Sequence, residues 1–338
     1  MIPDIVLFLA AYFFRIVGYS LAFPFLAAIF CEHGLGLRQI ALFYALSYFV
    51  RLILSFFVAN IARRMHSKMP ALGTFFSLVF LFILGVNPSL WPVLAFADAL
   101  ANSFYWTFHH AFFSQKMKNA DMIKDFRMIA FLAAAVAPMI GAVLLSFAGR
   151  WFLLFFAIGF LFLSSALLFF TDFKVQLRSH TPCFDPAQTL AFAAWGVDKM
   201  WPVFVFIFSG SYIYLGLFMA LPTVLRIIAP WFLKHLYGSR GFRDGFLLTV
   251  VHGFLRTFSL DPMAAFVLEV LSIPMMDIRD PSIDLFAYRR MTSIVDREFN
   301  LSLGFVLVMV LFAAFPSSWL FGLLSLTIGL AIYTLVRQ

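Results

Sequence analysis

The sequence predicts an all-α integral membrane protein, with about twelve transmembrane helices in two pseudo-symmetric bundles of six. Three observations predict this fold class. The chain has 338 residues, of which 63% are hydrophobic and 12% are charged, whereas soluble domains are about 45–50% apolar and about 25% charged. Apolar runs long enough to cross a bilayer recur along the whole chain. Basic residues gather in every second loop between these runs.

Twelve apolar runs are candidate spans, because about 20 mostly apolar residues cross the hydrocarbon core. In chain order they are 4–30, 39–62, 70–87, 89–113, 127–148, 150–172, 186–209, 212–234, 244–259, 262–285, 300–315 and 317–336. The ninth and eleventh are short, so ten or eleven spans are alternatives. A polar stretch with two prolines follows the sixth span. We therefore expect residues 1–172 to form an N-terminal bundle, 173–187 a cytoplasmic linker and 188–338 a C-terminal bundle.

The charges in the loops predict the orientation in the membrane. The loops after the even-numbered spans, with the C-terminus, hold most of the 24 lysines and arginines, whereas the alternate loops hold Arg38 and Arg150. Loops rich in Lys and Arg stay in the cytoplasm. We therefore expect a multi-pass protein of the plasma (inner) membrane with both termini cytoplasmic. The net charge of +8 resides in these loops, so we expect no nucleic-acid partner. We expect the chain to be a monomer in the lipid bilayer.

Span four carries a polar stripe. Because successive helical residues are rotated by about 100°, Asp98, Asn102, Tyr105 and His109 share one face of this span. Lipid cannot satisfy polar groups, so such a stripe faces a partner helix or a water-filled cavity. For His109, a plain hydrogen-bonded histidine is the alternative to a proton relay.

Span ten repeats this arrangement. Glu269 and Asp280 are eleven residues apart, which is also the spacing from Asp98 to His109. Asp280 has a second interpretation, as a cap of span ten that pairs with the basic residues at 289–290. The two spans are six apart, as expected for two similar halves.

Several charged residues lie near the middle of the bilayer at a rise of about 1.5 Å per residue: Arg15, Arg51, Asp98, Asp198, Arg226 and Glu269. Intramembrane charges often mark solute or proton pathways. We interpret Glu269 as a proton-coupling acid, because burial favours its neutral form unless Arg226 or Lys199 holds it ionised. An ion pair between Arg15 and Asp98 that only holds two helices together is the alternative for those residues.

Motifs of enzymes and metal sites are missing from the sequence. It contains no His-Glu-x-x-His, Cys-x-x-Cys, Walker loop or Gly-x-Ser-x-Gly, each of which supports a specific chemistry. The adjacent His109 and His110 face different directions on a helix, which is not metal-ligand spacing. We therefore expect no enzymatic activity, no metal and no cofactor.

Two segments carry a resemblance to a known family. Span five contains AAAVAPMIGAVLL (133–145), and span seven contains WGVDKMWPVF (195–204). The first is similar to the Gly-Pro-x-x-Gly-Gly antiporter motif of the major facilitator superfamily, and the second resembles a Trp-Pro pair of small prokaryotic members. The six-plus-six layout resembles the family too. The loop ANIARRMHSK (59–68) departs from the family's Gly-x-Leu-x-Asp-Arg-x-Gly-Arg pattern, and the usual arginine of span four is absent.

The resemblance implies a secondary active transporter of a small solute that works by alternating access. It places spans one, four, seven and ten around a central cavity. Proton coupling is a further hypothesis, and the degenerate motif at 133–145 favours export over import. Two alternatives remain: a lipid scramblase or flippase-like protein of the same fold, and a membrane-embedded lipid-modifying enzyme.

Overall fold

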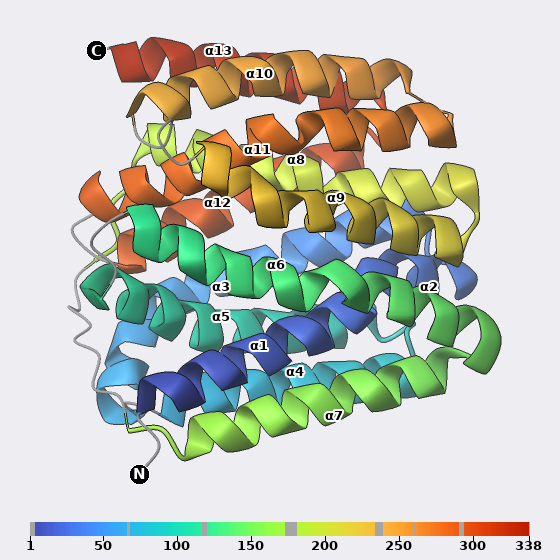
Figure 1. Ribbon diagram of the computed structural model, residues 1–338, viewed down its shortest axis with the longest axis vertical. Helices are drawn as coiled ribbons and strands as arrows, with labels where there is room; N and C mark the ends of the chain where they lie inside the picture. Colours follow the sequence, from blue (N-terminus) through green and yellow to red (C-terminus); the bar gives the residue numbers. More distant parts are fainter. Residues whose placement is uncertain are drawn as a thin grey trace.

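The computed structural model describes residues 4–65, 68–116, 120–172, 181–233, 239–259, 261–290 and 294–337. These residues form thirteen α-helices and no strand, and α1 and α2 together make the first of twelve long rods that run side by side (Figure 1). The first rod begins, and the last rod ends, on the same side of the molecule (Figure 1). An even number of crossings requires this placement.

The helices follow the predicted order of spans. The first six spans are α1 (Asp4–Ala22) with η1 (Phe23–Phe25) and α2 (Leu26–Glu32), α3 (Leu37–Met65), α4 (Met69–Val86), α5 (Trp91–Lys116), α6 (Ala120–Val143) with the π-helical turn η3 (Leu144–Ala148), and α7 (Arg150–Phe169). The last six are α8 (Pro186–Ser209), α9 (Tyr212–Leu233), α10 (Ser239–Phe258), α11 (Pro262–Arg290), α12 (Ile294–Ala314) and α13 (Trp319–Arg337).

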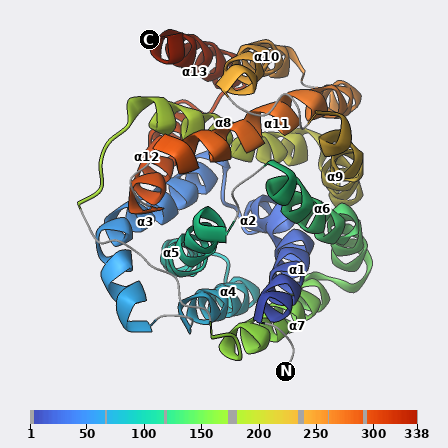
Figure 2. The same cartoon turned by 60° about the vertical axis from the view of Figure 1, so that its left-hand side comes forward.

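The same helix contacts occur in both halves of the chain. In the first half, α1 packs against α6 and α7, α5 against α3 and α4, and α4 against α7. Six spans later, α8 packs against α12 and α13, α11 against α9 and α10, and α10 against α13. The twelve rods therefore form two pseudo-symmetric six-helix bundles, seen nearly end-on in Figure 2. The domain limits at 172 and 187 stay predictions, and residues 173–180 lie outside the described residues.

The two bundles meet along α3 with α12 and along α6 with α9. Gly216 allows α9 to approach α6 closely, because a Cβ there would lie 2.5 Å from the Cβ of Ala142 and 3.0 Å from the carbonyl oxygen of Pro138. Atoms do not approach that closely without a shift of the backbone. The segment at 133–145 therefore lies at a contact between the halves.

Proline and aspartate explain two local features of the helices. Pro24 has no N–H to donate to the preceding turn, and the first rod changes there from α-helix to a 3₁₀ turn. At the start of α8, the Asp185 carboxylate accepts hydrogen bonds from the N–H groups of Ala187 at 2.9 Å and Gln188 at 3.2 Å. Pro186 follows this cap as the first helical residue, where its fixed φ suits a helix.

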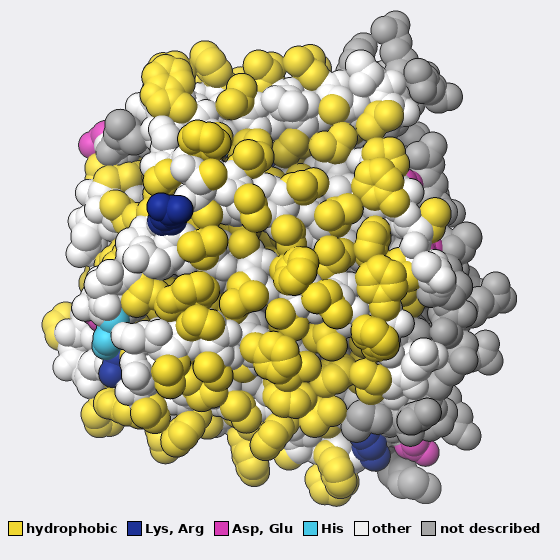
Figure 3. Space-filling view, turned by 180° about the vertical axis from the view of Figure 1, so that it is seen from behind, with side chains coloured by type: hydrophobic (Ala, Val, Ile, Leu, Met, Phe, Trp, Pro, Cys, Tyr) yellow, Lys and Arg dark blue, Asp and Glu magenta, His cyan; other side chains and the backbone are white. Residues whose placement is uncertain are grey.

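Hydrophobic side chains cover the outer surface of the bundle. They fill the middle of the face in Figure 3, and the few charged side chains seen there lie mainly near its edges. Phe147, Phe155 and Phe170 are each at least 71% exposed, as expected where lipid replaces water. Among the described residues, seven helices are long and apolar enough to cross a membrane, and α9, α10 and α13 each contain a shorter apolar stretch. The two rods left are α5 and α11, which carry the polar stripes.

Two predicted boundaries differ from the structure in an informative way. The predicted ninth and eleventh spans are short, but α10 has 20 residues and α12 has 21. The α12 helix begins at Ile294, before the predicted start at 300, because Asp296, Arg297 and Glu298 are buried in its first turns. Charged residues that contact other helices extend this rod beyond its apolar run.

Candidate functional site

A central cavity of about 540 Å³ lies between the two bundles. Its walls come from α1, η1, α2, α3 and α5 on one side and from α8, α9 and α12 on the other. Its polar and aromatic lining consists of Tyr19, Ser20, Phe23, Tyr44, Tyr48, Arg51, Asp98, Asn102, Trp106, Trp195, Asp198, Lys199 and Phe305. Pockets of about 300–1,000 Å³ hold small organic molecules, so this cavity is large enough for a small solute.

Asp98 on α5 accepts hydrogen bonds at both carboxylate oxygens. Ser47 Oγ donates to Oδ2 at 2.5 Å, and Asn102 Nδ2 donates to Oδ1 at 2.8 Å. The Trp106 indole N–H donates to Asn102 Oδ1 at 3.0 Å. Since an indole is a donor only, this bond fixes the Asn102 amide with its NH₂ group toward Asp98. Asp98, Asn102 and Trp106 therefore form one chain of hydrogen bonds along the cavity wall.

Lys199 on α8 reaches across the central cavity to α3. Its Nζ lies 4.7 Å from the ring centre of Tyr44 and 5.2 Å from that of Tyr48. It also donates a hydrogen bond to the Tyr48 hydroxyl at 3.3 Å. Aromatic faces attract cations, so these tyrosines hold the ammonium group at the cavity wall without an ion pair.

Asp198 and Glu269 share one cation, Arg256 on α10. Arg256 Nη1 lies 2.5 Å from Asp198 Oδ1, and its Nη2 lies 3.2 Å from Glu269 Oε2. The guanidinium carbon also lies 5.1 Å from the ring centre of Trp201. The cation beside Glu269 is therefore Arg256, rather than Arg226 or Lys199.

Arg279 on α11 completes this cluster in the C-terminal bundle. Its Nη2 lies 2.6 Å from Asp198 Oδ2, and its Nε lies 2.9 Å from Asp280 Oδ1. Asp280 also accepts a hydrogen bond from the Trp195 indole at 2.8 Å. Asp280 therefore contacts α8 as well as its own helix. Its expected partners at 289–290 have side chains outside the described part, so that interpretation stays a prediction.

A smaller pocket of about 240 Å³ adjoins the central cavity and shares Trp195, Asp198, Pro202 and Met219 with it. Arg226, Arg256, Glu269, Arg279 and Asp280 complete its polar lining. The Arg226 guanidinium donates to the sulfur of Met276. Among the described residues Arg226 forms no ion pair, although it lines the same pocket as three carboxylates.

Arg15 lies behind the wall of the central cavity. It donates hydrogen bonds to Thr74 at 3.1 Å, Ser77 at 3.3 Å and Tyr19 at 3.1 Å. Its guanidinium carbon lies 3.7 Å from the ring centre of Tyr105. Within the described residues it forms no ion pair with Asp98, so that alternative is wrong. Arg15 ties α1 to α4 through neutral partners.

Tyr105 and His109 are buried, and neither lines the cavity or the adjoining pocket. The His109 ring stacks on Tyr12 of α1, with ring centres 4.9 Å apart, and on Tyr105 at 5.6 Å. The polar stripe on α5 therefore divides. Its part near Asp98 faces the cavity, and its part near His109 packs against α1.

Polar contacts join the two bundles toward both ends of the molecule. Toward the termini, Arg51 on α3 forms an ion pair with Glu298 on α12, and His110 Nε2 lies 3.8 Å from Glu298 Oε1. At the opposite end, the Tyr212 hydroxyl on α9 donates to the carboxylate of Glu32 on α2. Arg51 therefore lines the cavity and also joins the two bundles.

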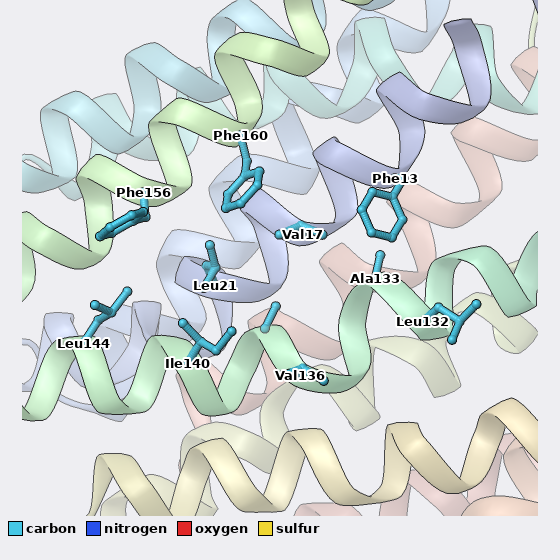
Figure 4. Close-up of a pocket in the computed structure, with 11 residues that line it drawn as sticks. Phe13, Val17, Leu21, Leu132, Ala133, Val136, Ile140, Leu144, Phe156 and Phe160 are labelled. Atoms are coloured by element: carbon cyan, nitrogen blue, oxygen red, sulfur yellow. The ribbon is translucent and has the colours of Figure 1, made fainter. Parts of the chain in front are cut away.

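A second pocket, of about 400 Å³, lies among α1, α6 and α7 and is apolar. Phe13, Val17, Leu132, Ile140 and Phe160 point into it from the three helices (Figure 4). It offers no charged side chain, and Phe13, Leu132 and Ile140 are also exposed on the outer surface. This pocket therefore suits hydrocarbon rather than a polar solute.

Four charged residues of the site are absent from the pathway residues predicted from the sequence: Lys199, Arg256, Arg279 and Glu298. A signal for Arg256 and Arg279 was present, because both lie inside apolar runs. Glu298 gave none, because it follows a run of loop-like residues. Among the described residues, no group of three or more His, Cys, Asp or Glu side chains could hold a metal ion.

Comparison with known proteins identifies the fold. No protein-family model and no curated protein matches the sequence. The structure is similar to that of the human organic anion transporter MFSD10 (TETRAN), with a TM-score of 0.68 over 99% of this chain and 100% of that chain, at 10% sequence identity. MFSD10 belongs to the major facilitator superfamily. This chain therefore has the major facilitator fold, as the sequence predicted.

Proposed function

We propose that this chain is a secondary active transporter that moves a small polar solute by alternating access. The observation that carries the proposal is the central cavity, which lies between two similar bundles and has charged groups from both in its wall. Buried charge is expensive inside a membrane unless it serves a pathway or a pair. Rocking of one bundle against the other would expose this cavity to each side in turn.

Polar contacts toward the two ends of the molecule support this proposal. The pair Arg51–Glu298 and the bond from Tyr212 to Glu32 each join one bundle to the other. In an alternating cycle, the contact toward one end of the molecule would break while the contact toward the other end stays formed.

We propose Glu269 as the proton-coupling acid. It shares Arg256 with Asp198, so a proton on Glu269 would release Arg256 to Asp198 alone. That change alters the charge of the pocket that adjoins the solute cavity. The direction we propose is export, and its support is the similarity of the segment at 133–145, which packs at the α6–α9 contact, to an antiporter motif.

Proteoliposomes test the proposal against its rivals. The purified chain is reconstituted with a pool of small polar metabolites inside, and an outward or inward pH gradient is imposed. Gradient-driven movement of a solute supports transport. Movement of labelled lipid without a gradient, or a chemically altered lipid, would instead support the scramblase or the enzyme.

Variants separate coupling from binding. Glu269→Gln is expected to abolish acceleration by the pH gradient while solute exchange between equal compartments continues. Arg38→Gln, at an exposed position on α3, is the control and should change neither. Full gradient response in Glu269→Gln would contradict the coupling role.

A further inference from the structure

Two opposite charges line the central cavity and interact electrostatically with each other. Asp98 belongs to the N-terminal bundle, and Lys199 belongs to the C-terminal bundle. Within the part of the chain that the structure describes, neither forms an ion pair. The other charges of the lining are matched, because Arg51 pairs with Glu298, and Asp198 pairs with two arginines.

The Asp98 carboxylate can accept more hydrogen bonds than the two side chains beside it donate. Both of its protein partners donate to it, Ser47 to Oδ2 and Asn102 to Oδ1. A carboxylate can accept about four hydrogen bonds. Asp98 therefore has room for a donor from the cavity, and its negative charge favours a cationic one.

Lys199 presents the opposite chemistry. An ammonium group has three N–H donors, and its one hydrogen bond to a described residue goes to the Tyr48 hydroxyl. The remaining donors can serve an acceptor in the cavity. A carboxylate or another anion would supply the counter-charge that the tyrosine rings do not.

We propose that the central cavity binds a zwitterionic solute, an amino acid with its ammonium group on Asp98 and its carboxylate on Lys199. This inference rests on the proposed transport function and names its substrate class. A solute that carries only one charge would leave the other protein charge unpaired and partly desolvated, which is unfavourable. A zwitterion satisfies both with charge-assisted hydrogen bonds. It would also join the two bundles, because Asp98 belongs to the N-terminal bundle and Lys199 to the C-terminal bundle.

Matched probes test the charge requirement. Thermal unfolding of the purified full chain is measured with the common α-amino acids and with glycine, β-alanine, γ-aminobutyrate and 6-aminohexanoate, which separate the charges progressively. The N-acetyl derivative and the amide of the best binder carry one charge each. We expect the zwitterion to bind at least about tenfold more tightly than either derivative, since each derivative loses one charge-assisted interaction. Equal binding of the N-acetyl derivative or the amide, or no response to any zwitterion, would overturn the proposal.

Variants assign the two ends of the solute. Asp98→Asn should weaken the zwitterion about tenfold or more and shift the preference toward the N-acetyl derivative, since no carboxylate is left unpaired. Lys199→Gln should shift the preference toward the amide. A shift in preference is measurable even in a variant of lower stability. Unchanged preference in either variant would overturn the assignment.

Arg38→Gln is the matched control, because Arg38 is an exposed cation on α3 that lines neither the cavity nor the adjoining pocket. It should leave zwitterion binding within about threefold of the native chain. If Arg226→Gln loses the carboxylate preference and Lys199→Gln keeps it, the proposed carboxylate site is wrong. The proteoliposome assay separates the two levels: movement of a non-zwitterion alone refutes the substrate class and leaves transport standing. Failure of every solute to move, with amino-acid binding intact, refutes transport itself.

Discussion

Arg51 on α3 and Glu298 on α12 form a buried ion pair that joins the two bundles. Their side chains are 7% and 2% exposed, so each charge depends on the other for compensation. Arg297 adds a second cation 3.1 Å from Glu298 Oε1. The contact between α3 and α12 therefore depends on electrostatics as well as on packing.

We expect Glu298→Met alone to destabilise the chain by about 3–5 kcal/mol, because it removes the carboxylate that pairs with the buried Arg51. Arg51→Met should destabilise it less, because Arg297 stays beside Glu298. The double variant should recover much of this loss, since an apolar pair of similar size is often neutral. Thermal unfolding in detergent measures all three. Additive losses in the double variant would show that the two side chains act independently.

Arg256→Gln is expected to reduce transport at least about tenfold, because Asp198 and Glu269 would lose a shared cation. Loss of one partner of a buried pair destabilises by about 3–5 kcal/mol. The measurement is initial rate in proteoliposomes, normalised to folded protein. Near-native transport by Arg256→Gln would place the cluster outside the working pathway.

Gly304 on α12 sets the distance to α8. A Cβ at Gly304 would lie 2.8 Å from the backbone nitrogen of Ala193, so Gly304→Ala should destabilise by about 1–3 kcal/mol through overpacking. Gly159→Ala is the matched control, because a Cβ there meets nothing within 4 Å. That change should be neutral or stabilising, by up to about 1 kcal/mol, since Ala favours helix. Unfolding temperatures compare the two, and equal shifts would contradict this packing.

Tyr105→Phe should leave transport within about threefold and stability unchanged or slightly raised. The Tyr105 hydroxyl is buried and has no hydrogen-bond partner among the described residues, and an unsatisfied buried hydroxyl is unfavourable by about 1–3 kcal/mol. Tyr19→Phe is the contrast, because the Tyr19 hydroxyl bonds with Arg15 and Ser77. A large loss of transport in Tyr105→Phe, but not in Tyr19→Phe, would indicate that the Tyr105 hydroxyl takes part in transport.

The sequence was sufficient for the architecture because hydrocarbon imposes a simple rule on every span. The same rule identified Asp98 and Asn102, since a polar residue in an apolar helix needs a partner. Helical spacing alone could not tell which part of the stripe met the cavity. His109 and Tyr105 share the face of Asp98, yet α1 covers them, which only the packing of neighbouring helices determines.

Pairings were harder to predict than positions. Arg15 and Asp98 lie at similar depths, but Arg15 turns toward neutral partners on α4 and Asp98 toward the cavity. Glu269 needed a cation, and the candidates considered were on α8 and α9, whereas Arg256 comes from α10. Depth along the bilayer follows from the chain, but the direction of a long side chain depends on which helices surround it.

The 3₁₀ turn at Pro24 has a mechanical consequence for the first span. A continuous helix resists bending because each carbonyl is tied to an amide one turn ahead, and Pro24 removes one such tie. The span is therefore two helical segments joined by a bend at Pro24. The segment after the bend carries Glu32, whose carboxylate accepts the hydrogen bond from Tyr212. A change of angle at the bend would break this contact and leave the hydrogen bonds of Arg15 in place.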